Sequence, residues 1–293
     1  MKPCIINVAD GVYLKGQERL KRSLKEVGLT SDLLFFDHIP SDWPKQEDVP
    51  MGFKVYAFEE AFNKGYDLVL WLDAACIAFR NLAPIFKILE KEGVFSFSRY
   101  NVSVGEWSSD YTLKEFGVTR EEAMRIPELV TCVFGINIKH QKGKAFFEEW
   151  QKRVRDNISF LGLPAPYKYK DTINNNRGLL SKNPIVKGHR WDQTTASLIV
   201  HKLGIKPTKC LVFDLVCEAK KGQPYASYIP TDTIIVQNRD IKTNQYLADL
   251  KKYTEPWKNK NIVYMGKTVY KSLTRRLKDL IKWHLIYKKR YNL

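Results

Sequence analysis

The residue of this sequence best placed to do chemistry is Asp73. It follows the run 66–72, which is apolar except for Asp67. A nearly continuous apolar run is typical of a strand buried on both faces of a sheet. Open α/β sheets bind ligands at the carboxyl ends of their strands, so this carboxylate could form part of a site. The alternative is that Asp73 only caps the following loop.

A second candidate is Asp192, within the segment 188–193 (GHRWDQ) and before an expected helix at 192–203. An aspartate there could take a proton from a hydroxyl as a general base, or hold the hydroxyl groups of a ligand. It could also be only the N-cap of the helix, because aspartate is a preferred capping residue.

The elements that must position these residues alternate between strand and helix. Apolar runs predict strands, and apolar residues at helical spacing predict helices between them, which favours an α/β fold with a mainly parallel sheet. The strands are expected at 4–9, 32–37, 66–72, 94–98, 130–138, 210–214 and 233–237, and the helices at 15–27, 53–64, 106–128, around Phe146 and Trp150, and at 192–203. A long irregular loop is expected at 160–188, which is usually functional or mobile.

Composition excludes several classes of protein. Of the 293 residues, 44% are hydrophobic and 13% aromatic, which is ordinary for a globular protein. The five cysteines form no CxxC pair, so neither a disulfide framework nor a zinc site is indicated. No stretch has the ~20 apolar residues that a membrane span needs. We therefore expect a soluble or peripheral protein in a reducing compartment, with a cytoplasmic location.

The net charge of +16 is concentrated at the C-terminus. Residues 267–293 hold nine Lys/Arg against one acid, Asp279, and so carry half of the excess. The segment 268–290 reads as a basic amphipathic helix with aromatic residues, which can dock on an anionic membrane surface. Packing on the body of the protein is the alternative. We expect a main domain at 1–265 and this helix at 266–293.

The segment from Lys54 to Phe86, KVYAFEEAFNKGYDLVLWLDAACIAFRNLAPIF, resembles the GT-A glycosyltransferases. In that family the central strand ends in an Asp-x-Asp motif that binds the ribose of a nucleotide-sugar donor and a divalent metal. Asp73 matches the first motif aspartate, and Ala75 stands in place of the second. The resemblance extends over residues 1 to about 240.

The resemblance implies a UDP- or GDP-linked sugar as donor, with Mn²⁺ or Mg²⁺ as the metal. A hard cation needs oxygen ligands, and Asp73 is the one motif carboxylate left to supply them. Either other residues complete a metal site, or metal binding is lost and cationic side chains neutralise the diphosphate.

The resemblance also implies roles for other positions. Gly135 and Asn137, in a strand at 130–138, would line the sugar pocket, and Gln193 beside Asp192 would face the sugar and the acceptor. Asn7 and Ala9 would lie beside the nucleobase of the donor, and Lys54 could reach its ribose or phosphate. The candidates for contacts with acceptor or phosphate are His189, Arg190, Trp107 and Asp110.

The sequence thus predicts an enzyme that transfers a hexose or related sugar from a nucleoside diphosphate to a hydroxyl of a glycan or lipid-linked acceptor. One rival is a catalytically inactive GT-A-like module that binds glycan or protein, which Ala75 keeps open. Another is a basic nucleic-acid-binding protein, although no reader motif is visible and no specific nucleic acid is expected.

Overall fold

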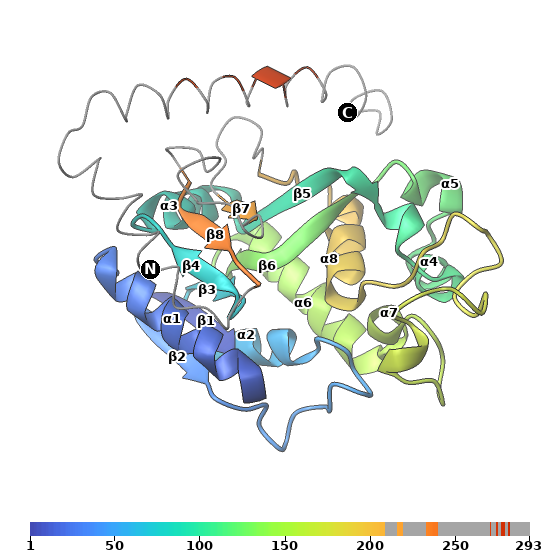
Figure 1. Ribbon diagram of the computed structural model, residues 1–293, viewed down its shortest axis with the longest axis horizontal. Coiled ribbons are helices and arrows are strands. Elements are labelled where there is room, and N and C mark those ends of the chain that lie inside the picture. The colour runs from blue at the N-terminus through green and yellow to red at the C-terminus, as the bar shows by residue number, and fades with distance from the viewer. Residues whose placement is uncertain are drawn as a thin grey trace.

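The computed structural model describes residues 1–208, 216–218 and 233–239, together with Tyr270, Thr274, Leu277, Lys278 and Ile281 (Figure 1). The predicted strand at 210–214 and nearly all of the predicted C-terminal helix lie outside this part of the chain. The boundary between 1–265 and 266–293 therefore stays a prediction. Among the described helices, none has the length and apolar character to cross a membrane.

The main sheet has five strands in the order β2-β1-β3-β6-β5. The strands β1 (Pro3–Val8), β2 (Asp32–Phe36) and β3 (Leu68–Leu72) run parallel. Strand β6 (Pro127–Asn137) is antiparallel to β3 and to β5 (Val94–Ser103). The predicted α/β fold with a mixed, mainly parallel sheet is confirmed, and the direction of β6 decides which of its ends can reach Asp73.

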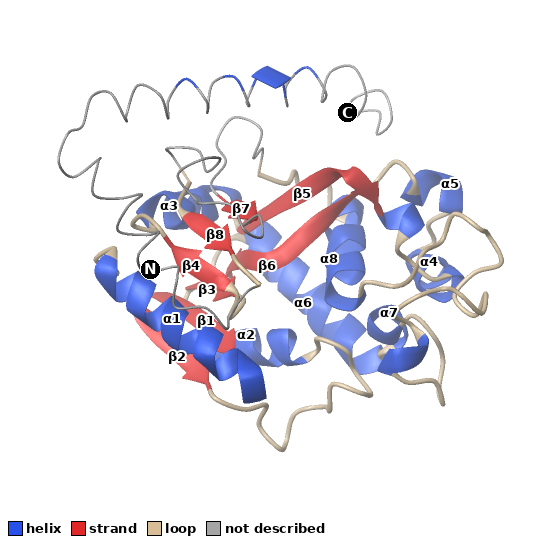
Figure 2. Ribbon diagram, in the orientation of Figure 1, coloured by secondary structure: helices blue, strands red, loops and turns tan. Residues whose placement is uncertain are grey.

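Helices cover both faces of this sheet (Figure 2). On one face, α2 (Phe53–Asn63), α6 (Gln141–Asp156) and α8 (Trp191–Lys202) share a core with Val69 and Trp71 of β3; α2 contacts β1 and β3, and α6 and α8 contact β6. On the other face, α1 (Leu14–Glu26) and α3 (Ala83–Glu92) share a core with Leu68, Leu70 and Leu72. Successive side chains of a strand point to opposite faces, so a strand covered on both sides is apolar throughout.

A smaller sheet follows the carboxyl end of β3. It consists of β4 (Cys76–Ala78), β8 (Ile235–Gln237) and β7 (Val216–Glu218), with β8 in the middle. The backbone N–H of Asn238, just after β8, donates to the carbonyl oxygen of Ala75 at 2.7 Å. This bond brings the 233–239 segment to the edge of the main sheet where Asp73 lies.

The single helix expected at 106–128 is wrong. The segment contains a 3-10 turn, η2 (Val104–Glu106), then α4 (Asp110–Phe116) and α5 (Arg120–Ala123). Gly117 adopts a left-handed conformation with φ of 65° and ends α4. Thr119 and Glu122 form the expected capping box and start α5. The loop after α6 contains α7 (Ile158–Leu161) and the 3-10 turn η3 (Tyr169–Asp171), and is otherwise irregular.

Candidate functional site

A cleft of about 930 Å³ opens at the carboxyl ends of β1 and β3. Its wall is made by the segment after β1, the start of α2, the start of β6 and the residues before α8. Of the residues predicted from sequence, the structure brings nine to this cleft: Ala9, Lys54, Asp73, Ala75, Trp107, His189, Arg190, Asp192 and Gln193.

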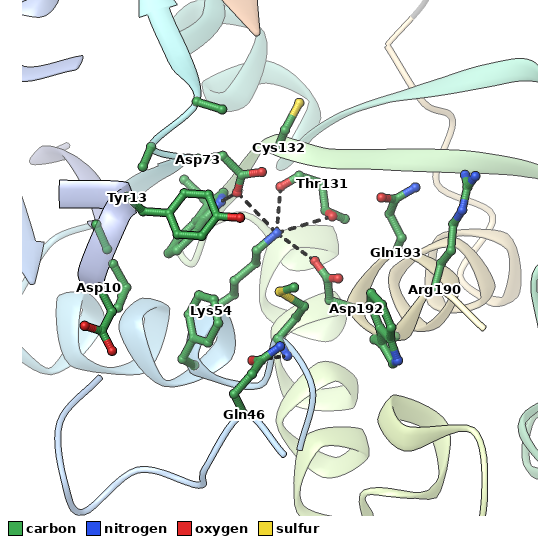
Figure 3. Close-up of a pocket in the computed structure, with 18 of the residues that line it drawn as sticks. Asp10, Tyr13, Gln46, Lys54, Asp73, Thr131, Cys132, Arg190, Asp192 and Gln193 are labelled. Atoms are coloured by element: carbon green, nitrogen blue, oxygen red, sulfur yellow. Dashed lines mark hydrogen bonds and ion pairs between the residues drawn. The ribbon is translucent and has the colours of Figure 1, made fainter. Parts of the chain in front are cut away.

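The ammonium group of Lys54 lies at the centre of the cleft floor (Figure 3). Its Nζ is 2.8 Å from Oδ2 of Asp192 and 3.4 Å from Oδ1 of Asp73. It also donates to the carbonyl oxygen of Thr131 at 3.3 Å and lies 3.5 Å from the hydroxyl of Thr131. One buried cation thus joins two carboxylates that are far apart in the sequence.

Lys54 keeps its charge in this environment. Burial disfavours the ammonium form, but the nearby carboxylates of Asp192 and Asp73 outweigh that penalty and hold the pKa of Lys54 above its usual range. The side chain is 6% exposed and lies over the ring of Trp71, with Nζ 5.3 Å from the ring centroid. The indole N–H of Trp71 donates to Oδ1 of Asp73 at 2.6 Å, which orients that carboxylate.

The backbone is strained beside both partners of the Lys54–Asp192 pair. Met51, in the turn before α2, has a φ of 60°, and Trp191, the first residue of α8, has a φ of 35°. Positive φ is costly for bulky residues and persists only where the surroundings enforce it. Asp192 is the second residue of α8, and Arg190 occupies the N-cap position, so the interpretation of Asp192 as a plain N-cap is wrong.

Aromatic and basic groups line one end of the cleft. The rings of Tyr169 and Trp191 have centroids 4.7 Å apart. The guanidinium of Arg190 lies 3.9 Å from the ring centroid of Trp107 and pairs with the buried carboxylate of Glu128. These flat apolar faces beside polar groups suit a sugar ring or another ring-shaped ligand.

The other end of the cleft is formed by the segment that follows β1. Ala9, Asp10 and Tyr13 line it, and Tyr13 is largely exposed. Asn7 does not line the cleft. Its Nδ2 donates to the carbonyl oxygen of Leu72 at 2.6 Å, and its Oδ1 accepts from Gln17 at 2.8 Å. Asn7 therefore ties the end of β1 to the end of β3, and the structure places it behind the site.

Gly135 and Asn137 do not reach the cleft. Because β6 is antiparallel to β3, its carboxyl end lies at the opposite edge of the sheet, where Asn137 pairs with Leu68 at the start of β3. Gly135 faces packed core, since a Cβ there would lie 3.1 Å from a methyl group of Leu89. The residues of β6 that do line the cleft are Val130, Thr131 and Cys132, near its amino end.

His189 lies in the wall of the cleft, 1% exposed. Its Nδ1 accepts from the backbone N–H of Ser109 at 3.4 Å, and its Nε2 lies 2.9 Å from the carbonyl oxygen of Ser159, which assigns the proton to Nε2. Burial lowers the pKa of His189 to about 4, so the ring is neutral near pH 7. His189 is therefore a buried, neutral residue of the wall.

Asp110 lies outside the cleft, where it pairs with Arg120.

The cleft does not fit a divalent metal at the Asp-x-Asp position. Oδ1 of Asp73 already accepts from Trp71 and faces the Lys54 ammonium. The carbonyl oxygen of Ala75 accepts from Asn238 and from the guanidinium of Arg19, at 3.1 Å. In the described part of the chain, no three His, Cys, Asp or Glu side chains are grouped as metal ligands. One partly engaged carboxylate beside two fixed cations is a poor donor set for Mn²⁺ or Mg²⁺.

Several residues of the cleft were missed at the sequence level. Thr131 was missed because residues near the carboxyl end of the 130–138 strand, Gly135 and Asn137, were expected at the site, whereas the residues near its amino end line the cleft. Trp71 was missed because a tryptophan in a buried strand reads as core. Trp191 was missed although it lies beside Asp192 at the start of α8. Other missed residues lie far from the motif in the sequence and carry no local signal: Gln46, Met51, Tyr169, Gln237 and Arg239.

No protein-family model matches the chain, and no curated protein matches it. Among solved structures it is similar to mouse xyloside xylosyltransferase 1 in its apo form, with 10% identity, a TM-score of 0.45, and coverage of 83% of this chain and 99% of that one. It is also similar to the bifunctional glycosyltransferase WbbM, with 12% identity and a TM-score of 0.47, covering 92% of this chain but only 51% of that one. An active-site mutant of LgtC follows, with 14% identity, a TM-score of 0.40, and coverage of 86% and 94%.

Proposed function

We propose that the chain is a glycosyltransferase that moves a sugar from a nucleoside-diphosphate donor to a hydroxyl of a glycan or glycoconjugate. The observation that carries the proposal is the charged group formed by Asp73, Lys54 and Asp192 on the floor of the cleft. These residues come from the end of β3, the start of α2 and the start of α8. Three elements of the fold therefore converge on a single polar point at a ligand-binding edge of the sheet.

The cleft has room for two substrates on either side of this point. The donor nucleotide would lie along the segment after β1, near Ala9 and Tyr13, with its ribose and diphosphate toward Asp73. The acceptor would lie against the aromatic end, near Trp107 and Trp191. The sugar to be transferred would then sit over Lys54 and Asp192. Catalysis would come mainly from positioning and from electrostatic stabilisation of the departing diphosphate.

Asp192 has two candidate roles in this arrangement. Its Oδ2 accepts from Lys54, so its other oxygen is the one to face a ligand. That oxygen would either hold hydroxyl groups of the donor sugar or take the proton from the acceptor hydroxyl. Asp192→Asn separates the roles, because loss of a base should reduce the turnover of bound substrate strongly, whereas loss of a sugar contact should mainly raise KM.

The proposal extends to the partners and the location that the sequence suggests. A lipid-linked or membrane-proximal acceptor would fit the basic tail at 268–290, with the protein in the cytoplasm and peripheral at an anionic membrane. Sedimentation of the full chain with vesicles containing phosphatidylserine tests this part. Binding that is lost when 268–290 is deleted supports it, and equal binding to neutral vesicles contradicts it.

A screen of UDP- and GDP-linked sugars tests the enzymatic proposal. A true donor should raise the melting temperature, because a ligand that binds only the native state stabilises it. The same donor should be hydrolysed slowly, or transferred when an acceptor glycan is present. Stabilisation without any turnover would favour the inactive binding module, which Ala75 keeps as the second candidate. If no nucleotide sugar stabilised the protein, the proposal would be wrong.

A further inference from the structure

The surroundings of the Lys54 ammonium have the composition of a cation site. Four oxygen atoms lie 2.8–3.5 Å from Nζ: Oδ2 of Asp192, Oδ1 of Asp73, and the carbonyl and hydroxyl oxygens of Thr131. We call this group the oxygen cradle. It combines two carboxylates with two neutral oxygens, and Figure 3 shows it converging on Nζ from β3, β6 and α8.

The Lys54 side chain is held in the oxygen cradle from all sides. Its stem rises from the first turn of α2 and is buried, and the ring of Trp71 lies beside the ammonium. The Asp73 carboxylate is oriented by the indole N–H of Trp71, and Asp192 lies in the first turn of α8. A lysine ammonium is a compact point charge with three donors, so it can occupy a place surrounded by oxygens as a metal ion does.

A second fixed cation lies at the motif. Arg19 of α1 is buried, and its guanidinium donates to the carbonyl oxygens of Ala75 and Asn238, at 3.1 and 2.7 Å. Arg19 is charged at every physiological pH. A divalent ion bound to Asp73 would thus lie close to the Lys54 ammonium, with the Arg19 guanidinium fixed at Ala75 and no carboxylate at position 75 to offset their repulsion.

We propose that Lys54 is the permanent cation of this cleft, in the place of a divalent metal, and that nucleotides bind there without one. The statement about nucleotides rests on the proposed function, whereas the statement about the oxygen cradle does not. Its consequence is specific: removing the ammonium should turn the cradle into a metal site, because two carboxylates and two neutral oxygens would then face an empty space.

Metal binding to the wild type and to Lys54→Ala tests the oxygen cradle. We expect the electron paramagnetic resonance signal of free Mn²⁺ to stay unchanged when wild-type protein is added, and the melting temperature to be the same in Mn²⁺ and in EDTA. Lys54→Ala should melt at a lower temperature and regain about 3 °C or more in Mn²⁺ or Mg²⁺. The matched control is Lys54→Ala/Asp73→Asn, which has lost one carboxylate of the cradle and should not respond.

Each outcome of this experiment counts for or against the proposal. Binding of Mn²⁺ by the wild type, abolished in Asp73→Asn, would overturn it. A folded Lys54→Ala variant with no response to either metal would also overturn it, since the cradle would then not be a cation site. If Lys54→Ala does not fold, the wild-type measurement still decides whether the cleft takes a metal.

Calorimetric titration with UDP and GDP tests the statement about nucleotides. We expect the Kd of whichever nucleotide binds to agree within about twofold between EDTA and Mn²⁺. An affinity about tenfold higher in Mn²⁺ would overturn metal-independent binding. If neither nucleotide bound in either buffer, the proposed function would fail, while the Mn²⁺ experiment would still decide the role of Lys54.

Discussion

The two edges of the main sheet use the same kinds of polar residue in different ways. At the edge opposite the cleft, Asp67 accepts from the backbone N–H of Lys2 and pairs with Lys139, whose side chain is 68% exposed. Asn137 is satisfied there by neighbouring backbone. At the cleft edge, Lys54 and Asp192 are 6% and 5% exposed and depend on each other.

The difference separates a structural use of charge from a functional one. Exposed pairs such as Lys139–Asp67 contribute little to stability, because water screens both partners. Burying an ion pair carries a desolvation penalty that often cancels its attraction, so stability alone gives little reason to place one in a cleft. The strained backbone at Met51 and Trp191, near the buried pair, also costs stability, so stability does not explain it either. The buried cluster is therefore where a function is expected.

The largest effect should come from removing the buried cation. Lys54→Met leaves the carboxylates of Asp192 and Asp73 without their partner, and we expect the free energy of unfolding to fall by about 3–5 kcal/mol. Urea denaturation measures this. The matched control at the opposite edge is Lys139→Met, which should change stability by less than about 0.5 kcal/mol. Equal effects of the two substitutions would contradict the contrast between the edges.

The next effect concerns activity. Asp73→Ala should reduce turnover of the nucleotide-sugar donor by roughly 100-fold or more, because it removes a group aimed at the reacting diphosphate. The fold should persist, since the Asp73 side chain is partly exposed and Lys54 keeps Asp192. Asn137→Ala is the matched variant at the opposite edge, and its turnover should equal that of the wild type. Unchanged turnover in Asp73→Ala would contradict the assignment of Asp73 to the donor diphosphate.

A pH effect should follow from His189. Its folded pKa of about 4 lies below the unfolded value of about 6.5, so the unfolded chain binds the proton more readily. The stabilisation is complete above about pH 6.5 and is lost as the pH falls through about 4. We expect a loss approaching 3 kcal/mol from this one group, measured by urea denaturation between pH 7 and pH 4.

The control for this prediction is a variant without the buried ring. His189→Gln should show a shallower pH dependence than the wild type. Identical slopes for the wild type and His189→Gln would show that the buried ring is not the titrating group.

The smallest effect should come from Gly135. Gly135→Ala places a methyl group 3.1 Å from Leu89 and 3.3 Å from Leu70, and such overpacking costs about 1–2 kcal/mol. Because Gly135 lies in the core and not in the cleft, the KM for the donor should stay unchanged. Thermal unfolding and steady-state kinetics measure the two effects. A raised KM for the donor with unchanged stability would show that Gly135 contacts the donor after all.

Much of the fold could be predicted because its signals are local. The apolar run 66–72 indicated a strand buried on both faces, and β3 is covered by helices on both faces. The capping box of Thr119 and Glu122 appeared where its spacing placed it. The prediction of one continuous helix over 106–128 was wrong because Gly117 ends α4. Glycine adopts the left-handed conformation readily, and this helix end was not recognised.

The candidate site could be predicted only in part. Asp73 and Asp192 line the same cleft, whereas Asn137 and Gly135, which were expected beside them, do not. A strand has the same alternating pattern whether it runs up or down the sheet, so its composition does not tell which end meets the ligand. Only the path of the chain through α4 and α5 into β6 sets that direction.

By itself, then, the sequence determined the five strands of the main sheet, most of the helices and the carboxylate at the end of β3, because burial and capping act over a few neighbouring residues. It did not predict the short strands β4 and β7 of the smaller sheet. Only the tertiary structure decided that Lys54 joins Asp73 to Asp192, which lies 138 positions after Lys54 in the chain. The reason is physical: the charge and orientation of a buried group are set by what surrounds it, and those surroundings come from three separate elements that meet only when the sheet is complete.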